Sequence, residues 1–130
     1  MELPFTLSGR VEHGRALGNT YNMPTANITP REDVSDLARG VYYSRIDIDK
    51  GSYPAITNLG VRPTVQNDGP VNAETFIYDY DGDLYGKTIS VTLLEFRRPE
   101  KKFDSLDELY ATVHDDFRAG RAFFGLSDDQ

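Results

Sequence analysis

The chain has 130 residues, a formal net charge of −7 and no cysteine. This length predicts one domain over residues 1–130, and the lack of cysteine excludes disulfides, thiolate catalysis and cysteine-based zinc sites. The acidity argues against general nucleic-acid binding, although one cleft can still attract an anion. No apolar run approaches the ~20 residues of a membrane span, and no signal-peptide pattern opens the chain. We therefore expect a cytoplasmic monomer without a membrane partner.

Strand patterns dominate the first part of the chain. Apolar and polar residues alternate over Phe5–Glu12, as in a half-buried strand. A loop rich in glycine and asparagine follows, and an extended piece is expected around Ala26–Ile28. The polar segment Pro30–Ala38 could hold a helical turn. Val41–Ile48 is rich in β-branched and aromatic residues, which predicts a strand.

The middle of the chain continues with strands joined by turns. Asp49-Lys50-Gly51 is a turn signal, and it predicts that Ser52–Asn58 returns as the next strand. Pro63–Val71 is expected to be a loop. Two further strand patterns cover Ala73–Tyr80 and Lys87–Phe96. Such closely spaced strands without intervening helices are typical of an antiparallel barrel or sandwich.

The C-terminal part has helical periodicity. Apolar residues recur every three or four positions from Leu106 to Phe117. Ser105 followed by Glu108 fits a capping box, which predicts that the helix begins just after Ser105. The charged segment Arg97–Lys102 before it is interpreted as a solvated connection.

Two neighbouring segments could contact a phosphate and a metal ion. In the loop Gly14–Met23, glycines allow backbone N–H groups to turn toward an anion, and Arg15 could add a guanidinium. Thr25 and Asn27 offer a hydroxyl and a carboxamide, oxygen ligands that suit Mg²⁺, and they lie on one side of an extended segment. The alternative is an ordinary connection whose threonine and asparagine cap loop backbone.

Glu74 is the candidate general base. It stands in a strand pattern, where glutamate is disfavoured. A carboxylate there could accept a proton from an attacking hydroxyl, whereas the alternative is a residue on a solvated face. The aspartates of "DYDGDLYGK" fit a turn better than a calcium loop, and the two histidines form no recognisable catalytic or metal pattern.

Several stretches together resemble the riboflavin kinase family. They are "HGRALGNTYNMPTANI", "GVYYSRI", "NLGVRPTV", "ETFIYDYDGDLYGK" and "LLEFRRPEKKFDSLDEL". They occur in the order typical of that family and cover nearly the whole chain. The similarity is greatest to the kinase module of bacterial bifunctional FAD synthetases. Those enzymes carry an adenylyltransferase domain that these residues do not contain, and the sequence leaves open whether the chain is a stand-alone kinase or a module.

The resemblance implies a mainly β fold, namely a six-stranded antiparallel Greek-key β-barrel with a C-terminal α-helix. It also implies transfer of the γ-phosphate of ATP to the ribityl 5′-hydroxyl of riboflavin, with Mg²⁺ as cofactor and FMN and ADP as products. The competing hypothesis is a β-barrel that binds a flavin or a nucleotide without turnover. A pure binder needs no base, so Glu74 favours the enzyme.

Site residues follow from the same resemblance. Thr25 and Asn27 correspond to the residues that serve magnesium and the phosphates, and Glu74 corresponds to the catalytic carboxylate. A glycine-rich flap over the nucleotide corresponds to Gly14–Thr20, and the flavin borders the region from Phe103 to Arg121. The residues implied for the nucleotide are Gly14, Arg15, Gly18, Thr20, Pro24, Thr25 and Asn27, and those implied for the flavin are Phe103 and Arg121.

Two positions depart from the family pattern. Asn22 stands where glycine is usual, which predicts a positive φ at Asn22, because asparagine tolerates that region best among the other residues. Gly120 stands where alanine is usual, which predicts a weaker last turn of the helix, since glycine costs ~1 kcal/mol relative to alanine.

Overall fold

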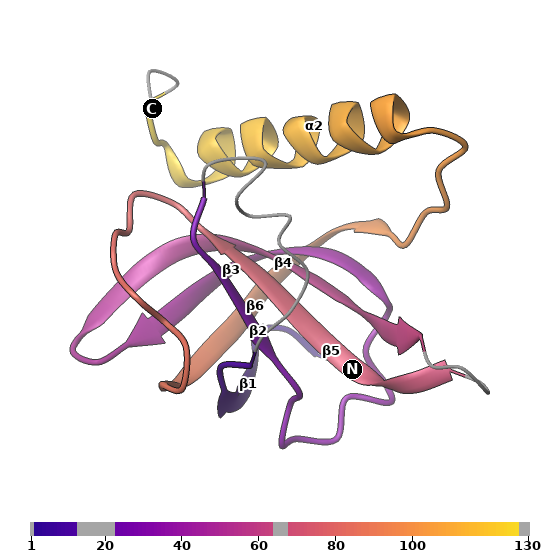
Figure 1. Ribbon diagram of the computed structural model, residues 1–130. Coiled ribbons are helices and arrows are strands. Elements are labelled where there is room, and N and C mark those ends of the chain that lie inside the picture. The colour runs from indigo at the N-terminus through magenta and orange to yellow at the C-terminus, as the bar shows by residue number, and fades with distance from the viewer. Residues whose placement is uncertain (1, 13–22, 64–67, 128–130) are drawn as a thin grey trace.

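Six antiparallel strands curl into a half-barrel, and one long helix lies across one face of it (Figure 1). The computed structural model describes residues 2–12, 23–63 and 68–127. Its elements are β1 (Phe5–Arg10), β2 (Thr25–Ile28), β3 (Gly40–Ile48), β4 (Gly51–Pro63), β5 (Asp68–Ile77), β6 (Thr88–Pro99) and α2 (Leu106–Phe124).

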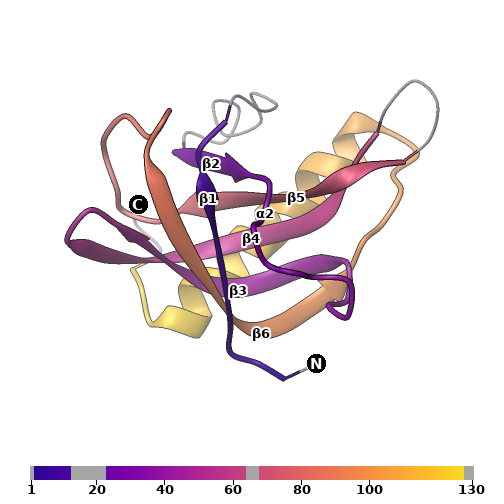
Figure 2. The same cartoon turned by 90° about the horizontal axis from the view of Figure 1, so that it is seen from below.

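The strand order is β1-β6-β3-β4-β5-β2. Strands β3, β4 and β5 pair in succession and β6 returns beside β3, which is the Greek-key arrangement. The edge strands β1 and β2 lie side by side (Figure 2). Each strand forms a backbone hydrogen bond with the segment just after the other, from Glu12 N to Asn27 O (2.7 Å) and from Arg31 N to Ser8 O (3.0 Å). The mainly β, six-stranded antiparallel fold with a C-terminal helix is therefore confirmed.

The hairpin between β3 and β4 shows how local sequence sets the register. Ile48 pairs with Gly51, which leaves Asp49 and Lys50 as the turn. Asp49 has a φ of 54°, a left-handed conformation that aspartate tolerates better than most residues. The predicted turn is confirmed.

One expectation about the connections is wrong, and another is met only in part. The expected loop Pro63–Val71 is mostly strand, because β4 runs to Pro63 and β5 begins at Asp68, with Val61 opposite Val71. The segment Pro30–Ala38 contains a turn, closed by a 3.0 Å hydrogen bond from Leu37 N to Val34 O, and no helix. So short a segment cannot easily offset the cost of nucleating a helix.

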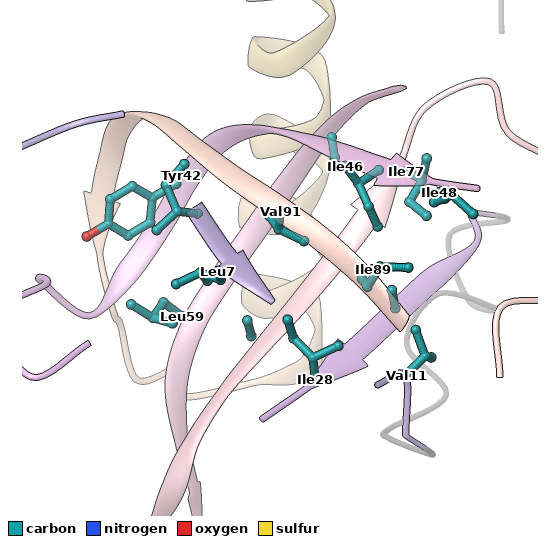
Figure 3. Packing of buried hydrophobic residues seen from close by; sticks show 14 of the residues in the cluster. Leu7, Val11, Ile28, Tyr42, Ile46, Ile48, Leu59, Ile77, Ile89 and Val91 are labelled. Carbon is teal, nitrogen blue, oxygen red and sulfur yellow. The ribbon is translucent and has the colours of Figure 1, made fainter. Parts of the chain in front are cut away.

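Two apolar cores lie on opposite faces of the sheet. The larger one fills the inside of the half-barrel (Figure 3) and includes Leu7, Ile28, Ile46, Leu59 and Val91. The smaller one lies between the sheet and α2 and consists of Val41, Ile56, Phe76, Tyr78 and Phe117. The second core holds the helix against the sheet.

The helix begins and ends at recognisable caps. Ser105 Oγ accepts a hydrogen bond from Glu108 N (3.1 Å), as the capping box predicts, and Gly125 ends the helix with a φ of 68°. No helix in the described ranges is long and apolar enough to cross a membrane.

Gly120 is buried inside α2, and the helix continues past it to Phe124. A Cβ at this position would overlap the hydroxyl of Tyr78 and press on Ile56. That hydroxyl donates a 2.7 Å hydrogen bond to Phe117 O. The glycine therefore allows a close approach between helix and sheet.

Candidate active site

Strand pairing brings three polar residues into one row. Asn27 of β2 lies opposite Glu74 of β5, and Glu74 lies opposite Asn58 of β4. Directly opposed residues in an antiparallel sheet have Cβ atoms about 4.5–5.5 Å apart and point to the same face. The two candidates Asn27 and Glu74, distant in sequence, are thus neighbours in the fold.

The row faces α2. Side chains two positions apart on a strand share a face, and Phe76 and Ile56, two positions from Glu74 and Asn58, belong to the core under the helix. Thr25 lies opposite Phe76, so it is on this face too. The sheet therefore presents an apolar row under the helix and a polar row beside it.

A cavity of about 500 Å³ opens between this face and α2. Its walls come from the strands, from the linker after β6 and from the first part of α2. The lining residues are Val41, Ile56, Asn58, Glu74, Phe76, Arg98, Glu100, Lys101, Lys102, Phe103, Leu109, Val113, Asp116 and Phe117. With one apolar wall and charged groups of both signs, the cavity suits a ligand that has a flat apolar part and a polar part.

Thr25 and Asn27 fit a cation that is bound mainly by phosphates. Asn27 is 5% exposed, and its carboxamide has no hydrogen-bond partner among the residues that the structure describes. Among the described residues, the Thr25 hydroxyl makes one long hydrogen bond, 3.3 Å to Met23 O. The residues that the structure describes contain no cluster of three or more histidine, aspartate or glutamate side chains that could hold a metal.

Pro24 lies immediately before β2. Its carbonyl accepts a 3.0 Å hydrogen bond from Ile77 N, and the ring fixes its φ. This contact anchors the beginning of β2 on β5 and thereby fixes where Thr25 lies.

The two candidates for the flavin lie in different places. Phe103 is half-buried and lines the cavity that Glu74 lines. Arg121 is not among the lining residues. Its guanidinium lies 5.2 Å from the ring centroid of Tyr78, 3.6 Å from Asp79 Oδ1 and 2.7 Å from Ser127 O. The structure thus brings Phe103, but not Arg121, together with Glu74.

The predicted flap lies outside the described residues. This holds for Gly14, Arg15, Gly18 and Thr20, and also for Asn22. Their assignment to the nucleotide and the positive φ of Asn22 stay predictions.

Several lining residues were not identified from the sequence, among them Asn58 and Arg98, and Asp116 was covered only by the region from Phe103 to Arg121. Their signals are visible in retrospect, since Asn58 interrupts the apolar face of β4, and Asp116 falls on the apolar face of α2, seven residues after Leu109. The interpretation of the charged linker was wrong for Arg97 and Arg98, which form ion pairs with the buried Asp116.

Comparison with known families gives a match over nearly the whole chain. A family model described as riboflavin kinase matches residues 1–124. The chain is 42% identical over 125 residues to the bifunctional riboflavin kinase/FMN adenylyltransferase of Escherichia coli K12, covering 95% of this chain and 39% of that protein. For the protein of the same name from Pseudomonas fluorescens, the identity is 40% over 119 residues, with 92% and 38% covered. The chain therefore spans about two fifths of the length of these curated relatives.

Solved structures share the fold. A macrolide-efflux protein from Streptococcus pneumoniae superposes with a TM-score of 0.77 at 33% identity, covering 91% of this chain and 38% of that one. Riboflavin kinase from Trypanosoma brucei superposes with a TM-score of 0.64 at 23% identity, covering 94% and 78%. The second likeness shows the fold alone.

Proposed function

The chain belongs to the riboflavin kinase family, and from this premise we propose that it transfers the γ-phosphate of ATP to the ribityl 5′-hydroxyl of riboflavin, giving FMN and ADP. The observation that carries the proposal is the position of Glu74. This carboxylate lines the cavity under α2 and lies directly opposite Asn27 on the neighbouring strand. The alcohol side and the phosphate side of the reaction would meet at this pair.

In this proposal Glu74 acts as the general base. Phosphoryl transfer needs in-line positioning and charge stabilisation more than covalent chemistry by the protein. The Glu74 carboxylate would accept a hydrogen bond from the ribityl hydroxyl, orient it toward the phosphorus and take its proton as the new P–O bond forms. General-base assistance of this kind contributes about 10²–10⁴ in rate.

Thr25 Oγ1 and Asn27 Oδ1 are the oxygens that would hold Mg²⁺. The magnesium ion, when bound, would supply charge neutralisation for the phosphates of ATP. Pro24 would keep these two side chains in place, and the flap residues Gly14, Arg15, Gly18 and Thr20 would cover the nucleotide. The Asn27 carboxamide supports this assignment, because it is buried and has no partner among the described residues, and a buried amide left unpaired costs stability unless a ligand uses it.

The flavin would occupy the apolar part of the cavity beside Phe103. Phe76 and Phe117 offer further aromatic surface there, and flat aromatic ligands gain from such contacts. Arg121 stays assigned to the flavin by resemblance alone. We also propose that residues 1–130 form one domain and that the protein acts as a monomer in the cytoplasm.

The direct test is incubation of the purified chain with riboflavin, ATP and MgCl₂, followed by chromatography for FMN and ADP. Equimolar FMN and ADP are expected, and the control is Glu74→Gln. If the folded protein yields no FMN, the proposed kinase function is wrong. Flavin binding without turnover would then favour the non-catalytic binding barrel.

A further inference from the structure

Asp116 is a buried charge for which the proposed reaction has no direct use. Its side chain is 4% exposed, and it lies on the face of α2 that packs on the sheet. Oδ1 accepts hydrogen bonds from Arg97 Nε and Arg98 Nε, both at 2.9 Å, and Oδ2 accepts one from Arg98 Nη2 at 2.6 Å. One carboxylate thus joins two consecutive residues of β6 to the helix.

Two consecutive strand residues can reach the same carboxylate because β6 is irregular there. Neighbouring side chains on a regular strand point to opposite faces. Val41 pairs with Arg98 and Tyr42 pairs with Phe96, so Arg97 is an extra residue without an opposite partner. Such a bulge re-aims side chains, and here it lets Arg97 and Arg98 converge on the helix.

Stability alone does not account for this cluster. Taking the Asp116 carboxylate out of water is costly, and a packed apolar group in the same place often stabilises a fold as well or better. What a bidentate arginine–carboxylate pair adds is a defined geometry. The question is therefore which geometry the cluster defines.

The cluster fixes the helix and the linker relative to Glu74. The cross-strand row that contains Glu74 and Asn58 continues through Val41 and ends at Arg98. Arg98 and Asp116 both line the cavity. The linker that carries Phe103 begins immediately after β6. The far wall of the cavity is therefore joined to the Glu74 row through this ion cluster.

We propose that Asp116 is a positioning residue for the acceptor: held by Arg97 and Arg98, it sets the distance between the Glu74 row and the wall formed by α2 and residues 100–105. The expected effect on riboflavin phosphorylation rests on the proposed kinase function. Loss of the cluster lets the wall shift, so the flavin is held less tightly and its hydroxyl is aligned less well. Thr25 and Asn27 are on β2, away from the cluster, so the nucleotide side is affected little.

The test variant is Arg97→Gln, because Arg97 does not line the cavity and acts only through its partners. Arg97 Nη1 also donates to Tyr43 Oη at 3.3 Å, so Tyr43→Phe is the matched control for that bond. Asp116→Asn tests the carboxylate itself, with Asp115→Asn as the exposed control on the neighbouring residue. All variants are compared at a temperature where circular dichroism shows them folded.

We expect KM for riboflavin to rise about tenfold or more in Arg97→Gln and Asp116→Asn, because the wall that would contact the flavin shifts. The turnover rate should fall as well, since a misplacement of about 1 Å can cost up to ~10²-fold in rate. KM for ATP should stay within about twofold, and both controls should resemble the parent. The proposal is overturned if a folded variant has an unchanged KM for riboflavin. It is also overturned if KM for riboflavin and KM for ATP rise alike, because a cluster that only stabilises the fold would not affect one substrate more than the other.

A second measurement separates this inference from the proposed function. Amide hydrogen exchange of residues 100–105, without any substrate, should be faster in Arg97→Gln than in Tyr43→Phe. If the parent makes no FMN, the kinase proposal fails while the exchange result still decides whether the cluster positions the wall. Equal exchange in the variant and its control overturns the positioning role. Arg97→Gln keeps the Arg98 pair, so the result is available even if Asp116→Asn does not fold.

Discussion

Replacing Gly120 with alanine should destabilise the protein, although alanine is the better helix former. The new methyl group would point at Tyr78, whose hydroxyl donates to Phe117 O, and at Ile56. Tyr78 is 1% exposed, and burial raises the pKa of its hydroxyl, so the group stays a neutral donor that needs its acceptor. Moving this buried hydroxyl away from the new methyl group would strain or break its hydrogen bond.

The magnitude follows from three effects. Alanine in place of glycine adds about 1 kcal/mol of helix stability. Displacing the Tyr78 hydroxyl leaves a buried donor unsatisfied, at about 1–3 kcal/mol, and overpacking a dense core costs about 1–3 kcal/mol more. The free energy of unfolding should therefore fall by about 1–5 kcal/mol.

Urea unfolding followed by circular dichroism at 222 nm measures this change. Ala122→Gly, at an exposed position of the same helix, is the propensity control and should cost about 1 kcal/mol. In a Tyr78→Phe background the penalty of Gly120→Ala should be smaller, because the hydroxyl that it displaces is gone. A Gly120→Ala protein as stable as the parent, or more stable, would refute the close-approach argument.

Three further predictions concern the site and one loop. Glu74→Gln should keep riboflavin binding and lower kcat by ~10²-fold or more, because the amide cannot accept the proton; an unchanged kcat would place Glu74 outside the chemistry. Thr25→Ala should leave the fold intact and raise the magnesium concentration needed for half-maximal activity; an unaltered magnesium titration would make Thr25 an ordinary strand residue. Partial burial raises the pKa of Glu32, but hydrogen bonds from the Ser8 hydroxyl (2.5 Å) and N–H (2.7 Å) outweigh it and leave this pKa below its usual value. The ionised Glu32 therefore makes its full contribution to the free energy of unfolding above about pH 4.3, the usual pKa of glutamate. This contribution is lost as the pH falls through the lowered pKa of the folded protein. Glu32→Gln should accordingly reduce the difference in unfolding free energy between pH 7 and pH 3, and an unchanged difference would contradict the assignment.

The elements that the sequence predicts well are those with local causes. The Asp49-Lys50 turn and the Ser105 cap depend on residues within one turn of the chain, so their signals can be recognised without the fold. The pairing of Asn27 with Glu74 joins residues far apart in sequence. Only the family resemblance, and no local pattern, indicated that these two residues belong to one site.

The elements that sequence reasoning misjudged depend on partners elsewhere in the fold. Pro63 and glycine near it suggest a loop, yet pairing between β4 and β5 keeps the chain extended to Pro63. The basic run after Phe96 looks solvated until the β6 bulge turns Arg97 and Arg98 toward a carboxylate on α2. In both cases, contacts with residues far away in the sequence determine the local structure.

The order of strand pairing also bears on how the site forms during folding. Strands β3, β4 and β5 pair in chain order, whereas β1 and β2 pair with strands much later in the sequence, Phe5 with Leu93 and Asn27 with Glu74. Closing such long loops is entropically costly, and long-range pairing is slow. The part of the sheet that carries Glu74 and Asn58 can thus form first. Thr25 and Asn27 reach their final positions only when β2 pairs with β5. On the ribosome, the segment proposed to hold the metal is made before its partner strands and becomes organised only after they exist.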